Sequence, residues 1–175
     1  MTESKWANRW IWASIINGLF ATIWTLYFFG PIQPTPSPSR VIAGGSAGTW
    51  LFVGYISYIV VGVLATAITA LFYYYIEVTL NKPFSGITNI FAWLHLILGN
   101  IGVIGATWLM MIAGYQGGAA LLPASVGGGG LTVAQVHEQI LAPYPYMIEP
   151  FILMVAAGAL LGGLAYVISW KGKTK

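Results

Sequence analysis

The chain has 175 residues, of which 58% are hydrophobic and only 6% are charged, and it contains no cysteine. A soluble domain carries about 25% charged residues, so this composition argues against a soluble globular protein. The lack of cysteine excludes disulfides, thiolate metal ligands and cysteine nucleophiles. The net charge of +3 does not indicate nucleic-acid binding, because the basic residues stand at the ends of apolar stretches, as topology signals do.

Four long apolar stretches lie between Trp10 and Trp170, and none of them contains Lys, Arg or Asp. A helix needs about 20 apolar residues to cross the hydrocarbon of a bilayer. We therefore expect an all-α integral membrane protein with four transmembrane helices, in which residues 1–175 form a single membrane domain. The predicted spans are residues 10–29, 49–76, 87–115 and 150–170.

The first predicted span, Trp10–Phe29, has aromatic residues near both ends, as expected where rings lie at the membrane interface. Its apolar run ends in bulky rings, which make a poor cleavage site, so we interpret it as a retained span and not as a signal peptide. Four prolines in the following segment, Pro31–Arg40, favour an extended loop.

The second predicted span, at residues 49–76, measures about 42 Å at 1.5 Å per residue, enough to cross the hydrocarbon with some tilt. The third contains a polar cluster of Asn89, His95 and Asn100. The fourth is expected to begin at Pro150, because proline suits the first turn of a helix. Glu149, the last residue of the preceding loop, has an acidic side chain that the dipole at the helix N-terminus would favour.

The longest predicted connection runs from Gly117 to about Glu149. Within it, Thr132 and Gln135 form a capping-box pattern, and apolar residues follow at helical spacing. We expect a short helix at the outer membrane interface here, ended by two prolines. The apolar residues are Val133, Val136, Ile140 and Leu141, and the prolines are Pro143 and Pro145.

Basic residues gather on one side of this four-span topology. The side with both termini and the loop between spans two and three holds six of the seven, and the other side holds only Arg40. An excess of Lys and Arg in short loops marks the cytoplasmic side. We therefore expect both termini in the cytoplasm of a prokaryote, in a multi-pass protein of the cell membrane. The six residues are Lys5, Arg9, Lys82, Lys171, Lys173 and Lys175.

Small residues are frequent in the predicted spans, and Gly158 with Gly162 forms a GxxxG pattern. Such spacing lets helix backbones approach closely, so we expect tight packing, either within the chain or with a partner. The Tyr73–Tyr75 run is interpreted as an interfacial aromatic belt, with quinone binding as the alternative.

Few side chains could carry catalysis. Glu77 and Glu149 are expected at opposite membrane faces, and so are His95 and His137, so neither pair can act together. We predict no catalytic, cofactor-binding or metal-binding residue, and no cofactor. His95 is expected to hydrogen-bond an adjacent helix. A surface metal site shared with another chain, through His137 and Glu138, remains the alternative for the outer loop.

Residues 48–58 read G-T-W-L-F-V-G-Y-I-S-Y, and residues 94–102 read L-H-L-I-L-G-N-I-G. They resemble D-T-Y-Y-V-V-A-H-F-H-Y and L-H-F-W-L-x-F-I-G, two motifs in the last helices of subunit I of haem–copper oxidases (cytochrome c or quinol oxidases). The likeness covers most of residues 10–170, although the first and fourth spans match only in hydropathy and order. It implies the packing of that family's last four helices.

The departures from the family pattern concern its redox centre. Tyr55 and Ser57 stand where the family has its two haem-ligating histidines, and residues 118–120 are small where it has the arginines that hold haem propionates. The helices with the copper ligands have no counterpart, and His95 matches a family histidine that binds no cofactor. The resemblance therefore implies a helical copy without the haem and copper ligands.

We therefore expect a non-catalytic accessory transmembrane subunit of a respiratory terminal oxidase, packing against its catalytic subunit. The expected partners are other membrane subunits of that complex and lipids, with quinone as a further candidate, and no nucleic acid. The alternative is a structural subunit of another membrane metalloenzyme, such as an ammonia- or methane-monooxygenase-like complex. A small transporter is less favoured, because only Asn100 offers a polar group at mid-membrane.

Overall fold

The computed structural model describes residues 4–172, and within that range all regular structure is helical. The α-helices and the shorter 3₁₀ and π segments, labelled η, are as follows: α1 Lys5–Phe29, α2 Pro38–Ala43, α3 Gly48–Ser57, η1 Tyr58–Ala65, α4 Thr66–Tyr74, η2 Tyr75–Thr79, α5 Ile87–Leu121, η3 Ala124–Val126, α6 Val133–Val136, η4 His137–Leu141 and α7 Tyr144–Lys171.

Four helices of the described range are long and apolar enough to cross a membrane, which confirms the predicted number. Three of them are the single helices α1, α5 and α7. The fourth, which is the second span, is the continuous run Gly48–Thr79, formed by α3, η1, α4 and η2. Their 25, 32, 35 and 28 residues give lengths of about 38 to 53 Å, which exceed the roughly 30 Å of bilayer hydrocarbon.

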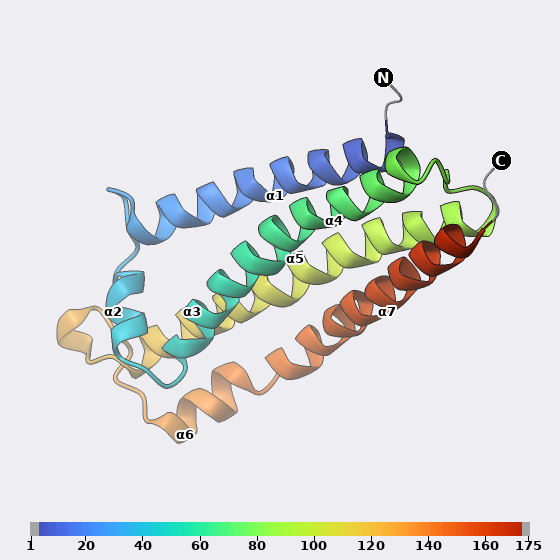
Figure 1. Ribbon diagram of the computed structural model, residues 1–175. Coiled ribbons are helices and arrows are strands. Elements are labelled where there is room, and N and C mark those ends of the chain that lie inside the picture. Colours follow the sequence, from blue (N-terminus) through green and yellow to red (C-terminus); the bar gives the residue numbers. More distant parts are fainter. Residues whose placement is uncertain (1–3, 173–175) are drawn as a thin grey trace.

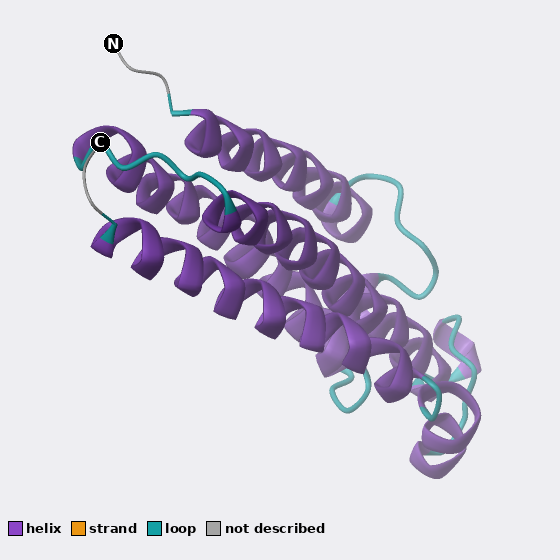
Figure 2. Ribbon diagram, turned by 90° about the vertical axis from the view of Figure 1, so that its right-hand side faces the viewer, coloured by secondary structure: helices purple, strands orange, loops and turns teal. Residues whose placement is uncertain are grey.

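The long helices lie side by side, and the short helices gather at one end of the bundle (Figures 1 and 2). At the other end Ser4 and the Trp6 amide donate to Glu77, and the Lys82 ammonium donates to the carbonyl of Trp170. The two ends of the described chain therefore share one end of the bundle, as an even number of spans requires. We call it the terminal end.

Helix α5 packs against both the second span and α7, while α1 packs mainly on the second span. Glycines set the closest approaches. A Cβ at Gly102 would come within 2.7 Å of the Phe151 carbonyl oxygen of α7, and one at Gly54 within 2.8 Å of the Thr107 carbonyl oxygen of α5. Gly158 faces the backbone of Gly99. These small residues therefore serve packing within the chain.

The predicted bounds of the first and fourth spans are wrong at their starts. Helix α1 begins at Lys5 instead of Trp10, because the Ser4 hydroxyl caps it by accepting from the amide of Ala7. Helix α7 begins at Tyr144, so Pro150 lies inside it and Pro145 occupies the first turn. The expected placement of Glu149 beside the helix N-terminus is accordingly wrong.

Two segments predicted as loops are partly helical. The Pro31–Arg40 segment ends in α2, with Pro38 in the first turn of that helix. Helix α5 continues past Tyr115 to Leu121, because Gly117 and Gly118 allow close packing on residues 41–48, where any side chain would collide. A short helical segment is present in the predicted region as α6 and η4, and the capping box between Thr132 and Gln135 is confirmed.

The second span contains an eight-residue π-helical segment, η1, which the sequence pattern does not predict. Such segments are rare in proteins and are frequently found at functional sites. Here η1 lies opposite α5, where the ring of Tyr58 packs against Gly62, so that a Cβ at Gly62 would come within 2.9 Å of it. The wider turn thus places a large buried side chain in the middle of the bundle.

Candidate functional site

The interior of the bundle near the terminal end holds an aromatic cluster to which all four spans contribute. The His95 imidazole of α5 lies 4.6 Å from the ring centroid of Trp10 in α1 and 6.1 Å from those of Tyr73 in α4 and Tyr166 in α7. Its Nδ1 forms a 3.3 Å hydrogen bond with the Tyr73 hydroxyl. The expected hydrogen bond from His95 to an adjacent helix is therefore confirmed.

Space for the imidazole comes from the glycine of α7 that faces it. A Cβ at Gly162 would overlap the His95 ring, so the GxxxG pattern of α7 is used to admit a side chain of α5. Gly158, one turn earlier, meets Gly99, which lies one turn after His95 in the antiparallel neighbour. The register of α5 on α7 therefore follows from the positions of these glycines.

A cavity of about 180 Å³ adjoins this cluster and is bordered by all four spans. His95 and Trp10 line one part of it, and two threonines of α4 line another. Both threonine hydroxyls donate to carbonyls of their own helix, Thr66 to Val61 and Thr69 to Ala65. The cavity could hold a single ring or a few water molecules, at roughly 30 Å³ per water.

A polar network, separate from the aromatic cluster, lies deeper in the bundle and joins the first three spans. The Asn17 amide donates to the Asn100 side-chain oxygen over 2.7 Å, and the Tyr58 hydroxyl donates to the Asn17 oxygen over 3.0 Å. The side-chain nitrogen of Asn100 donates to the Leu96 carbonyl. Asn17 and Tyr58 are 2% and 0% exposed, so these bonds replace all contact with water or lipid.

The predicted polar cluster of the third span does not form. Asn89 borders a pocket at the terminal end, His95 belongs to the aromatic cluster and Asn100 bonds to Asn17, so the three side chains have separate neighbours. Glu77 and Glu149 lie at opposite ends of the bundle, as expected. His137 begins η4 among the short helices and is exposed, far from His95.

Residues 4–172 bring together no group of three or more His, Asp or Glu side chains able to hold a metal ion. Buried polar atoms without a hydrogen-bond partner lie mainly near the aromatic cluster. They are Trp10 Nε1, Tyr166 Oη and Ser169 Oγ, together with Trp108 Nε1 further along α5. The cluster can therefore donate hydrogen bonds beside an imidazole, but none of the described residues that line the adjoining cavity is a carboxylate.

Sequence reasoning missed Trp10, Tyr73 and Tyr166 as neighbours of His95. A signal for Tyr166 was present, because the pairing of Gly158 with Gly99 and of Gly162 with His95 places the next turn of α7 beside the imidazole. No comparable pattern marks Trp10 or Tyr73, whose approach depends on how α1 and α4 are rotated.

Comparison with known proteins gives no match: no protein-family model, curated protein or solved structure is significantly similar to this chain. The likeness to the last helices of haem–copper oxidase subunit I therefore stays a prediction. Functional interpretation depends on the residues and contacts described above.

Proposed function

We propose that the chain is a non-catalytic accessory transmembrane subunit of a respiratory terminal oxidase of the haem–copper type, packing against its catalytic subunit in a prokaryotic cytoplasmic membrane. The observation that carries the proposal is that most polar side chains inside the bundle bond to one another or to backbone carbonyls of the helices. Asn17, Tyr58 and Asn100 form one such network, which joins three helices. Polar groups used in this way fix the arrangement of helices and are not available to a substrate.

The positions that carry the resemblance support the same role. Tyr55, which stands where the family has a haem-ligating histidine, forms a 2.7 Å hydrogen bond with the Thr25 hydroxyl of α1. Tyr55 is only 9% exposed and packs against Phe28. The residue aligned with the family's haem ligand thus serves a contact between the first and second spans, which suits a subunit that retains packing without redox chemistry.

The outer face of α7 offers a surface for the catalytic subunit. Leu160 and Leu164 are exposed there, and a Cβ added at Gly163 would meet no atom within 4 Å. Gly163 therefore differs from Gly162, its neighbour in sequence, which is filled by His95. A partner helix could approach closely at Gly163, because a missing side chain lets two backbones come together.

Affinity purification from the native membrane tests the proposal. The tagged chain, extracted in mild detergent, is expected to retrieve a complex with the visible absorption of haem. Gly163→Leu is expected to reduce that retrieval, whereas Ala67→Leu, a matched change at an exposed site of the second span, is not. A retrieved complex that lacks haem contradicts the oxidase assignment.

The same experiment separates the alternatives. A complex that contains copper without haem would favour a subunit of a monooxygenase-like assembly. A chain that retrieves no other subunit would favour independent action, including transport. The transporter alternative has lost its one candidate group, because both side-chain atoms of Asn100 that could bind a solute are used within the bundle.

A further inference from the structure

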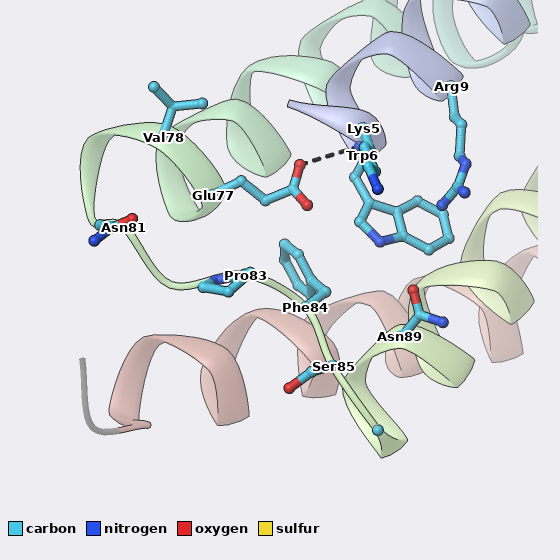
Figure 3. A pocket seen from close by; sticks show the side chains of 11 residues that line it. Lys5, Trp6, Arg9, Glu77, Val78, Asn81, Pro83, Phe84, Ser85 and Asn89 are labelled. Atoms are coloured by element: carbon cyan, nitrogen blue, oxygen red, sulfur yellow. Dashed lines mark hydrogen bonds between the residues drawn. The ribbon is translucent and has the colours of Figure 1, made fainter. Parts of the chain in front are cut away.

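A pocket lies at the terminal end, between the start of α1 and the loop that leads into α5. Its volume is about 590 Å³. Figure 3 shows the side chains around it, which come from α1, η2, the 80–86 loop and the first turn of α5. Lys5 and Arg9 are its cations, Glu77 is its one carboxylate, and Ser85 and Asn89 add neutral polar groups.

The charges in this pocket are arranged so that the cations remain available. One oxygen of Glu77 accepts from the Trp6 amide at 3.0 Å, as Figure 3 shows, and also from the Ser4 hydroxyl, so this carboxylate is engaged at the N-terminus of α1. Within residues 4–172 neither Lys5 nor Arg9 forms an ion pair, and with the single Glu77 carboxylate the pocket keeps a net positive charge.

Two indole rings hold Arg9 in place. Its guanidinium carbon lies 4.4 Å from the ring centroids of both Trp6 and Trp93, which meet at 73°. The guanidinium thus packs into the angle between the two rings, and its in-plane N–H groups stay free to bind an anion. This arrangement orders a cation before any ligand arrives, which lowers the cost of binding.

Beyond the pocket, apolar side chains of α1 and α5 are exposed. On α1, Ile16 lies two turns after Arg9 and is 50% exposed. On α5, Ile97 follows Asn89 and is 45% exposed. Further along, Phe20, Trp24 and other apolar residues of both helices line a second cavity of about 320 Å³. Charge at the end and apolar surface along the helices match a lipid and not a free anion.

The distance between the two cavities fits an acyl chain. Arg9 and Phe20 are eleven residues apart on one helix, or about 17 Å. Half of a bilayer's hydrocarbon is about 15 Å thick. A chain that starts at a headgroup in the pocket would therefore reach the near edge of the second cavity, at Phe20, at about the depth of the bilayer centre.

We propose that the pocket at the terminal end binds the headgroup of one phospholipid from the leaflet at that end, with the phosphate against Lys5 and Arg9 and an acyl chain lying along the exposed apolar residues of α1 and α5 toward the second cavity. The chemistry recognised is a phosphodiester attached to a long apolar chain. The site does not depend on the subunit role proposed above, because the residues that form it all belong to this chain.

Native mass spectrometry of the full-length chain in detergent micelles tests this site with dioleoyl phosphatidylglycerol as the probe. We expect one tightly bound lipid per chain. Lys5→Gln and Arg9→Gln should each weaken binding about fivefold, and the double variant about 25-fold. Lys171→Gln removes an equal charge from the same end, outside the pocket, and should leave affinity unchanged. Arg9→Lys, which keeps the charge but not the planar guanidinium, should restore only part of the affinity lost in Arg9→Gln, and unchanged helical circular dichroism would show that the variants fold.

Three results would overturn the proposal. Equal binding of dioleoylglycerol would show that the phosphate plays no part. Equal binding of glycerol phosphate would show that the site takes soluble phosphates and that the apolar side chains beyond the pocket play no part. An equal loss with Lys171→Gln would show that only the general charge of this end matters.

Discussion

The hydrogen bonds of Asn17 should stabilise the bundle measurably. Replacing Asn17 with Leu keeps the size of the side chain but removes the bonds to Asn100 and Tyr58, 2.7 and 3.0 Å long. Hydrogen bonds between membrane helices contribute about 0.6 kcal/mol on average and up to about 1.7 kcal/mol each. We therefore expect the free energy of unfolding to fall by about 1–3 kcal/mol.

A double-mutant cycle isolates the bond between the two asparagines. Asn17→Leu, Asn100→Leu and the double variant are unfolded in mixed micelles of mild detergent and dodecyl sulfate, with helical circular dichroism as the signal. The coupling energy between positions 17 and 100 should be about 0.6–1.7 kcal/mol. A coupling energy near zero, or a more stable Asn17→Leu variant, would refute the view that this network fixes the helices.

Two further predictions concern packing and capping. Gly162→Ala should destabilise the bundle by about 1–3 kcal/mol, because the new methyl group overlaps the His95 imidazole. Gly163→Ala, which meets no other atom, should not destabilise it. Thermal unfolding distinguishes the two variants, and equal effects would contradict the register of α5 on α7. Ser4→Ala should cost about 1 kcal/mol and speed hydrogen exchange at the amide of Ala7, because that amide loses its acceptor; unchanged exchange would contradict the cap.

The number of spans could be predicted because hydropathy depends on composition over some 20 residues, which local detail does not disturb. The residues at which the helices begin and end could not be predicted in the same way. Two prolines, Pro145 and Pro150, suit a first turn equally well, and only packing in three dimensions selects the earlier one. Gly117 and Gly118 were interpreted as a flexible loop, although they are helical and permit contact with residues 41–48.

Contacts inside the bundle were predictable only where the sequence fixes a register. The glycines of α5 and α7 do so, and the surroundings of His95 on that side follow from them. The bond between Asn17 and Asn100 joins residues 83 positions apart and depends on the rotation of α1, which no local pattern encodes. The pocket of Lys5 and Arg9 likewise forms only when α1 begins four residues after the N-terminus instead of at Trp10.

The haem and copper content of the purified chain, compared with that of the complex it retrieves from its own membrane, tests the subunit assignment most directly. The account predicts no stoichiometric haem or copper in the isolated polypeptide and clear haem absorption in the retrieved complex. One haem or copper ion per isolated chain would contradict it, because the interior polar groups would then serve a cofactor and not the packing of helices.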